Sequence, residues 1–376
     1  MQAQFPLRDG LIYLNHAGVG PWPAATREAV CRFAEENASQ GATDYPQWMQ
    51  VDKRLRQRLS ELINAPSSDD IALVKSTSEG LSFVAYGLDW REGDNVVGIA
   101  EEFPSNRWVW ESLASRGVEY RKISLMSARD PEGALLDLTD GRTRLLAVSS
   151  VQYASGIRLD LARLGEACRQ RGILFCVDAI QSLGALRFDV QAIGADFVSA
   201  DGHKWLLAPE GLGLFYCRAD LRQQLVLHEV GWHGAEDLGN FDQQNWQPAA
   251  SARRFECGSP NMLGIYGLDA SLGVLLAEGL ENVERQVLER VQHLMEEISR
   301  APELELLTPR ETARHGGIVT FKLKHGSAQQ AHAELMRSGV ICAPRGGGIR
   351  FAPHFYTPYS ALDEALVRAR HYASVT

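Results

Sequence analysis

The chain has 376 residues and a net charge of −9, with 45% hydrophobic and 23% charged residues. This balance is typical of a globular protein of two or three domains that buries a large core. The acidic charge and the lack of long single-sign runs argue against nucleic acid as a partner, because phosphates call for a basic face.

The cysteines and the N-terminal segment indicate the compartment. None of the six cysteines lies in a CxxC pair, which favours free thiols in a reducing cytosol and gives no sign of a metal site. The cysteines are Cys31, Cys168, Cys176, Cys217, Cys257 and Cys342. The first residues, MQAQFPLRDG, form no apolar signal segment. No uncharged apolar run reaches the roughly 18 residues of a membrane span. We therefore expect a cytoplasmic protein without a membrane partner.

The first two thirds of the chain alternate helical patterns with short apolar runs. Helices are predicted at residues 24–36, 48–63 and 161–171. Strands are predicted at residues 71–74, 95–100, 145–151, 173–177, 197–200 and 211–217. Because these runs are nearly continuous in apolar residues, they indicate parallel strands covered on both faces. The alternation predicts a doubly wound α/β domain.

The pattern changes after about residue 255. Val287, Val291, Leu294 and Ile298 mark one face of a long helix. Two strands follow, at 318–323 and 349–352, and a last helix at 360–372. We expect a large α/β domain over residues 16–254 and a small α+β domain over residues 255–376. Residues 1–15 could pack on either.

The first strand runs into a possible phosphate site. It is followed by VKSTSEG, in which Ser76 and Glu79 form a capping box. Thr77 and Ser78 are then additional hydroxyls at a helix N-terminus, where free N–H groups and the helix dipole favour a phosphate. Alone, this pattern is equally well explained as an ordinary helix cap.

Three further residues follow the ends of predicted strands: Phe103, Asp178 and Lys204. Taken singly, they are explained by core packing, by helix capping and by a surface lysine. In parallel sheets, however, ligands gather at the carboxyl ends of the strands. A phosphate cradle, a flat aromatic, an acid and a lysine are together what pyridoxal phosphate requires. A desolvated lysine amine also becomes nucleophilic, because its pKa falls.

The order of these motifs resembles the class V aminotransferase family of fold type I pyridoxal-phosphate enzymes. That family includes cysteine desulfurases, kynureninases and isopenicillin N epimerase-like proteins. The matching motifs are Thr77-Ser78-Glu79-Gly80, Glu102-Phe103, Asp178-x-x-Gln181 and Gly202-His203-Lys204. The resemblance covers nearly the whole chain, residues 13–357. It implies a large domain with a mainly parallel sheet flanked by helices, a small C-terminal α+β domain, and pyridoxal 5'-phosphate as cofactor.

The resemblance implies a role for each matching residue around the cofactor ring. Lys204 is expected to form the Schiff base with the aldehyde, and Asp178 to hold the pyridinium nitrogen. Gln181 is expected to bond the phenolic oxygen, and Phe103 to stack on the ring, where desulfurases usually place a histidine. Tyr153 aligns where desulfurases carry an asparagine near the ring, and Gln152 is its rival for that contact.

Other matches concern the phosphate and the substrate. Thr77, Ser78 and His203 are expected to bind the phosphate. Ser259 is expected to reach the phosphate of a neighbouring subunit, which implies a homodimer with shared active sites.

The substrate residues are expected to come from both ends of the chain. Arg350 matches the arginine that clamps the substrate carboxylate, although it could be a solvated residue at a strand start. Asn15 and His16 are expected near the substrate, although a turn without chemistry is equally possible.

Two residues depart from the family pattern. Asp201 stands where the family often has a phosphate-binding serine; an ionised carboxylate would repel a phosphate, so Asp201 must turn away or serve another partner. Cys342 lies in an apolar segment eight positions before Arg350, with no mobile loop around it. We interpret Cys342 as a core residue, which argues against persulfide chemistry.

For function, the sequence favours transamination of a small amino acid, with the freed Lys204 amine as general base at the α-carbon. The alternatives are an amino-acid epimerase, a cysteine desulfurase-like carbon–sulfur lyase, or a catalytically silent binding protein that keeps the fold. A long polar and aromatic segment, residues 228–246, is expected as a loop near the site.

Overall fold

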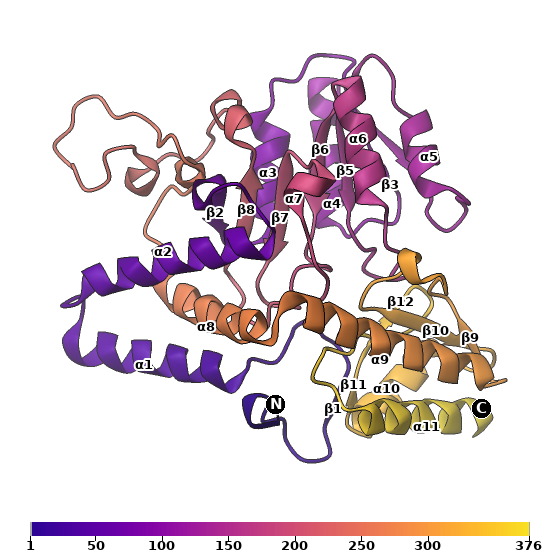
Figure 1. Cartoon of the computed structure of the whole chain (residues 1–376). Helices are drawn as coiled ribbons and strands as arrows, with labels where there is room; N and C mark the ends of the chain where they lie inside the picture. Colours follow the sequence, from indigo (N-terminus) through magenta and orange to yellow (C-terminus); the bar gives the residue numbers. More distant parts are fainter. Residues whose placement is uncertain (1, 376) are drawn as a thin grey trace.

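The computed structural model describes residues 2–375, and within them the chain forms a large and a small lobe (Figure 1). The large lobe is built on a seven-stranded sheet of order β2-β8-β7-β6-β5-β3-β4. Its strands are β2 (Ile71–Val74), β3 (Asn95–Ile99), β4 (Glu119–Ile123), β5 (Thr143–Ser149), β6 (Leu174–Asp178), β7 (Phe197–Asp201) and β8 (Gly213–Cys217). All six strands predicted for this domain are confirmed, each with a shift of at most two residues at either end.

Two features of the sheet were not predicted. Strand β4 is an edge strand with mostly polar, partly exposed residues, so it has no apolar run to detect. Strand β8 runs antiparallel to both of its neighbours, β7 and β2. As a result β2 runs in the same direction as β7, and its C-terminal end reaches the same sheet edge as those of β3, β5, β6 and β7.

Helices cover both faces of this sheet (Figure 1). They are α1 (Ala24–Gln40), α2 (Tyr45–Leu62), α3 (Thr77–Gly87), α4 (Ser105–Glu111), α5 (Pro131–Asp137), α6 (Leu161–Arg171), α7 (Val190–Ile193) and α8 (Met262–Glu278). Short 3₁₀ helices occur at Gln2–Gln4, Ser68–Asp70, Ser112–Arg116, Ala219–Gln224, Trp232–Gly234, Ala252–Phe255 and Thr312–Arg314. The three predicted helices of this region are confirmed as α1, α2 and α6.

The small lobe is an α+β unit around a second core. Its antiparallel sheet has the order β12-β13-β10-β9. The strands are β9 (Leu304–Leu306), β10 (Val319–Leu323), β12 (Ala343–Arg345) and β13 (Gly348–Phe351), and the helices are α9 (Leu280–Arg300), α10 (Ala328–Arg337) and α11 (Tyr359–Val375). The predicted apolar face of α9 is buried, and the two predicted strands and the last helix are confirmed as β10, β13 and α11.

Helices α8 and α9 link the two lobes. Helix α8 packs against α1 and α2, and Leu268 and Leu272 join the core of the large sheet. The core of the small lobe takes up α9 from Val291 onward. At the N-terminus, β1 (Ile12–Tyr13) pairs in parallel with β11 (Val340–Ile341), so this segment lies on the small lobe.

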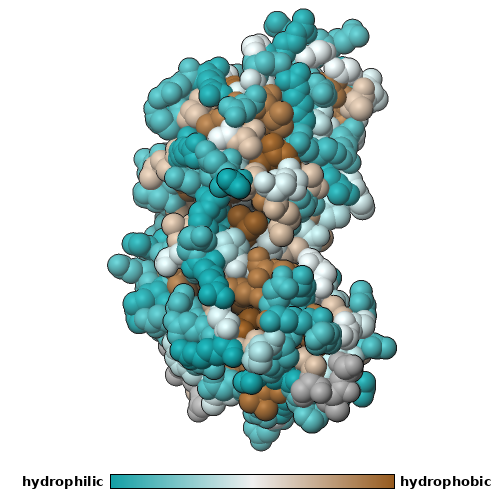
Figure 2. Space-filling view, turned by 90° about the vertical axis from the view of Figure 1, so that its right-hand side faces the viewer, coloured by the Kyte–Doolittle hydropathy of each residue, from teal (hydrophilic) through white to brown (hydrophobic). Residues whose placement is uncertain are grey.

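Figure 2 shows the side of the molecule that carries α5 and the small lobe. This surface is largely hydrophilic, with apolar residues visible in a band along its middle. In the described part of the chain, no single helix is long and apolar enough to cross a membrane. Only the pair α8 and α9, bent by 82°, passes that test when both helices are taken together.

Candidate active site

A cavity of about 330 Å³ lies at the sheet edge where the strands β2, β3, β6 and β7 end. Nine of the predicted site residues line it: Thr77, Ser78, Phe103, Tyr153, Asp178, Gln181, His203, Lys204 and Arg350. The reversed direction of β8 explains why the start of α3 belongs to this group. It lets β2 deliver Thr77 and Ser78 to the edge that also receives Asp178 from β6 and Lys204 from β7.

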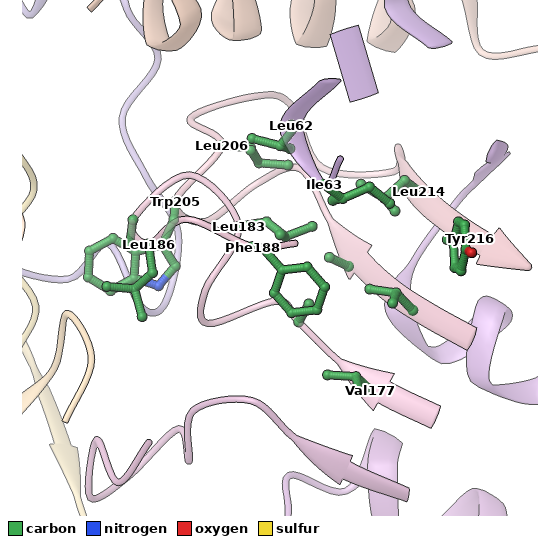
Figure 3. Close-up of a cluster of buried hydrophobic side chains, with 14 of the residues drawn as sticks. Leu62, Ile63, Val177, Leu183, Leu186, Phe188, Trp205, Leu206, Leu214 and Tyr216 are labelled. Atoms are coloured by element: carbon green, nitrogen blue, oxygen red, sulfur yellow. The ribbon is translucent and has the colours of Figure 1, made fainter. Parts of the chain in front are cut away.

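Lys204 is anchored by Trp205, the next residue along the chain. Trp205 is fully buried, and Figure 3 shows it with Leu206 in a cluster of buried apolar side chains. Trp205 donates a hydrogen bond from Nε1 to Gln181 Oε1 (2.8 Å), and its carbonyl lies 3.0 Å from His354 Nε2. The backbone that carries Lys204 is therefore fixed on two sides.

The Lys204 amine lies 5.5 Å from the centroid of the Phe103 ring. Burial lowers the pKa of this amine to about 8, against the opposing attraction of Asp178. A larger share of this amine than of an ordinary lysine is thus unprotonated near neutral pH, as a lysine that captures an aldehyde requires.

Asp178 is a strand-end acid with few partners. It is 3% exposed, and its Oδ1 accepts one hydrogen bond, from the Ile180 amide at 3.0 Å. Burial raises the pKa of this carboxyl group to about 6, although that bond and Lys204 act in the opposite direction. A buried acid of this kind gains most from a cationic ligand group, which fits the protonated nitrogen of a pyridine ring.

The start of α3 provides donors for an anion. Ser76 caps the helix by accepting a hydrogen bond from the Glu79 amide (3.3 Å), and the first amides of a helix have no acceptor within it. The buried Thr77 Oγ1 has no hydrogen-bond partner, and Ser78 Oγ donates to Ser105 Oγ at 2.7 Å. Since a buried hydroxyl without a partner is costly, the cradle fits a phosphate.

Asp201 lies beside His203 at the edge of this cavity. Its Oδ1 is 3.0 Å from His203 Nδ1, and neither atom has another partner. The structure thus gives Asp201 the partner that the sequence left open. The imidazole thus turns Nδ1 toward this carboxylate.

The aromatic side of the cavity is formed by Phe103 and Tyr153, whose rings meet edge to face at 5.2 Å. The loop that carries Phe103 is held by Glu102, which accepts hydrogen bonds from both the amide and the hydroxyl of Ser149. Gln152, the rival of Tyr153, does not line the cavity. Its side chain bonds to backbone groups of its own turn and of Glu101, so its role is structural.

Gln181 keeps only part of its hydrogen-bonding capacity for a ligand. Its Oε1 accepts from Trp205, and its Nε2 donates to the Ala17 carbonyl at 3.1 Å. One amide N–H of Gln181 is therefore left for a ligand oxygen.

Arg350 is held in place from two directions. It donates to the Tyr153 carbonyl (2.7 Å) and to Asn15 Oδ1 (3.1 Å), while its buried Nε has no partner. Burial lowers the pKa of this guanidinium, which is 2% exposed, to about 10. Arg350 is thus not a solvated surface arginine. Asn15 reaches the site by orienting Arg350.

Three predicted site residues lie outside the cavity lining: Asn15, His16 and Ser259. His16 is fully buried, and its ring nitrogens contact the Ala352 carbonyl (2.8 Å) and the Tyr356 hydroxyl (2.7 Å), so neither is free for a substrate. Ser259 is exposed and does not line the cavity of its own chain.

The long segment 228–246 does not lie at the cavity as expected. Most of it projects from the large lobe, at the left of Figure 1. Only His228 and Glu229 come near, in a separate groove beside α3. Cys342 is buried outside the cavity lining, and burial raises the pKa of its thiol to about 12.

Several residues of the cavity lining were not predicted as site residues: Ala17, Gly18, Val19, Ser105, Ile180, Arg345 and Ser76, which was expected only as a helix cap. Ser105 could have been found from the sequence, because it begins helix α4 shortly after the loop that carries Phe103. Arg345 is placed by the β12–β13 hairpin of the small lobe, whose Gly346-Gly347 turn was not used in the sequence analysis.

A lysine amine, a buried acid, an aromatic wall and a helix N-terminus at the edge of a mainly parallel sheet define a fold type I site for pyridoxal phosphate. The chain belongs to the aminotransferase class-V family, whose family model matches residues 12–354. Pyridoxal phosphate is the cofactor of this family, and the donor set described above fits it.

Relatives and solved structures of similar chains agree with this assignment. A probable cysteine desulfurase of Methanothermobacter thermautotrophicus is 30% identical, over 95% of this chain and 93% of its own. A cysteine desulfurase of Cronobacter sakazakii is 31% identical, over 89% and 84% of the two chains. An apo cysteine desulfurase from Thermococcus onnurineus has a TM-score of 0.89 at 24% identity, covering 100% of this chain and 98% of its own. A cystine C–S lyase solved with cysteine persulfide has a TM-score of 0.90 at 24% identity, covering 98% and 99%.

Proposed function

We propose that the protein is a pyridoxal-phosphate-dependent carbon–sulfur lyase that acts on cysteine or a small cysteine derivative and releases the sulfur directly. The names of its relatives, cysteine desulfurases, support cleavage of a carbon–sulfur bond. A cystine C–S lyase solved with its product cysteine persulfide has the same fold.

The observation that carries this proposal is the absence of a thiol at the site. Among the described residues that line the cavity there is no cysteine. Cys342, the thiol nearest in sequence to Arg350, is 3% exposed and strongly protonated. A desulfurase that transfers sulfur to its own cysteine needs an accessible thiolate. Without such a thiolate to accept it, the sulfur would be released into solution.

In this proposal the cofactor is held by residues with separate tasks. Lys204 would bind it covalently, Asp178 would pair with its ring nitrogen, and Phe103 would stack on its ring. Thr77 and His203 donate to its phosphate. Pyridoxal phosphate supplies an electron sink for the electron pair released at the substrate's α-carbon.

The remaining steps belong to the side chains of the chain itself. The Arg350 guanidinium binds the substrate carboxylate and so orients the α C–H bond toward Lys204. The unprotonated Lys204 amine then accepts the α-proton as general base. Cysteine and water thus yield pyruvate, ammonia and sulfide.

The test is a product analysis of the reconstituted protein with L-cysteine, L-cystine and L-alanine. A lyase releases pyruvate and sulfide from L-cysteine in equal amounts over many turnovers, and K204A releases neither. Pyridoxamine phosphate with keto acid and no sulfide establishes transamination, which the sequence favoured. Formation of the D-amino acid establishes an epimerase. If no product forms from any of the amino acids, the alternative that remains is a catalytically silent binding protein.

We also propose a homodimer, because Ser259 is exposed and lies apart from the cavity of its own chain. In a dimer it would donate to the phosphate of the partner's site. The cytoplasmic location stays a prediction from the sequence.

A further inference from the structure

We infer that Arg345 is a second anion-binding residue of the site, and that the enzyme selects amino acids whose side chain ends in a second anionic group, such as a carboxylate or a sulfinate. This inference deepens the proposed function and rests on it. It assigns to Arg345 the choice between substrates, while Arg350 holds the α-carboxylate common to all of them.

The register of one hairpin places both arginines on the same face. In the β12–β13 pair, Ala343 lies opposite Arg350, and Arg345 lies opposite Gly348. Residues two apart on a strand point to the same side, so Arg345 shares the face of Ala343 and Arg350. The two arginines are then diagonal neighbours, at a distance that long side chains can span.

The turn of this hairpin fixes that register. Gly346 and Gly347 connect the strands with φ angles of 58° and 78°. Two successive positive φ values are typical of the tight turns that match the twist of a hairpin, and glycine adopts them without strain. Gly348, the cross-strand neighbour of Arg345, has no side chain. No side chain of the hairpin therefore separates Arg345 from Arg350 on this face. Both arginines line the cavity.

The hairpin wall of the cavity carries positive charge that the chain does not compensate. Among the described residues, neither Arg345 nor Arg350 has a carboxylate within ion-pair distance. Arg345 donates only to its neighbouring Pro344 carbonyl, at 2.8 Å. Its charge lowers the pKa of both Lys204 and Arg350, as expected for a cation facing them. Of the acids in the lining, Asp201 is in contact with His203 and Asp178 lies on the sheet side.

A substrate with only an α-carboxylate satisfies Arg350 and leaves Arg345 unpaired beside it. A substrate with a second anion at the end of a short side chain offers Arg345 a charge-assisted, two-pronged hydrogen bond. An exposed arginine that merely solvates the surface would show no such preference. The two explanations therefore differ in a measurable quantity, the discrimination between dianionic and monoanionic ligands.

The experiment measures dissociation constants by calorimetry on the holoenzyme with unreactive probes, succinate as the dianion and butyrate as the monoanion. We expect the wild type to bind succinate at least tenfold more tightly. R345Q should lose about tenfold for succinate and less than twofold for butyrate. R345K should retain part of the preference, since it keeps the charge without the fork. The control R310Q removes another exposed arginine of the small lobe, outside the cavity, and should change neither constant.

Equal binding of the two probes by the wild type, or an R345Q variant that weakens both or neither, overturns the inference. These outcomes are separate from the fate of the proposed function. If sulfide is released from L-cysteine but the two probes bind equally, the proposed lyase activity stands and the role of Arg345 is refuted. Probe discrimination without release of sulfide from L-cysteine, persulfide from L-cystine or a sulfur oxyanion from L-cysteine sulfinate keeps the second anion site and removes the lyase.

Discussion

Lys204 owes its reactivity to its surroundings. The side chain leaves a backbone pinned by buried Trp205, and it enters a cavity whose other cations, Arg345 and Arg350, disfavour a third positive charge. Asp178 is the main group that limits this effect, by attracting the ammonium form. The balance of burial, repulsion and attraction is what makes the amine a nucleophile at physiological pH.

This balance predicts the pH dependence of amine labelling in the cofactor-free protein. Only the unprotonated amine reacts, so the labelling rate of Lys204 should rise with pH and reach half its maximum near pH 8. An ordinary lysine titrates at about pH 10.4. Competitive acylation followed by peptide mass spectrometry measures the midpoint. A midpoint for Lys204 close to that of an ordinary lysine would contradict the role of burial.

The variant Asp178→Asn tests the sign of the opposing contribution. Asp178 is ionised at pH 8, because its own pKa is about 6, and its charge raises the pKa of Lys204. Removing that charge should move the labelling midpoint of Lys204 to lower pH. A midpoint that moves upward would show that Asp178 acts on the amine in another way.

At the scale of elements, the site depends on a close approach of the N-terminal segment to the Lys204 loop. Gly20 donates a hydrogen bond to the His203 carbonyl at 2.7 Å. A Cβ atom at residue 20 would overlap the Lys204 carbonyl oxygen and crowd Leu207. The N-terminal segment therefore serves as a brace for the loop that carries the reactive lysine.

Gly20→Ala should displace this loop. We expect a loss of about 1–3 kcal/mol in the free energy of unfolding, as is typical of overpacking, together with weaker binding of the cofactor. The matched control is Gly141→Ala, because a Cβ atom there meets nothing within 4 Å. Denaturant unfolding of both variants measures the difference, and equal stabilities would refute the brace.

Elements with strong local patterns could be predicted from the sequence. The strands β6 and β7 and the helix α6 were located because buried strands are continuous apolar runs and because Gly172 ends α6 in a left-handed conformation. The cavity residues that directly follow strands were found for the same reason. Strand β4 and the direction of β8 depend on pairing between distant segments, which local patterns do not reveal.

At the scale of the whole molecule, the two lobes and the N-terminal segment meet at the cavity. The large lobe contributes Lys204 and Asp178, the small lobe Arg350, and the N-terminal segment Asn15. The segment 226–246 instead exposes apolar side chains, with Phe241 75% exposed. The other exposed apolar residues of this segment are Val226, Val230, Trp232, Leu238 and Trp246. An apolar surface of this kind is expected to be covered in an assembly, which agrees with the proposed homodimer.

Subunit mixing tests whether Ser259 serves the partner's site. Ser259→Ala alone should weaken cofactor binding about tenfold, the size expected for one hydrogen bond to a charged group. Mixed dimers of K204A and S259A chains should regain one site of wild-type affinity, because Lys204 from one chain then meets Ser259 from the other. Titration of the mixture with pyridoxal phosphate measures the number and the affinity of these sites. The absence of any tight site in the mixture would contradict sharing across a dimer.

The central claim is that the Lys204 amine is the residue that captures the cofactor. Reconstitution with pyridoxal phosphate, borohydride reduction and peptide mapping test it most directly. We expect one pyridoxyl group per chain, on the peptide that contains Lys204, and none in K204A. A pyridoxyl group mapped to another lysine, or no stable attachment in the intact protein, would contradict it.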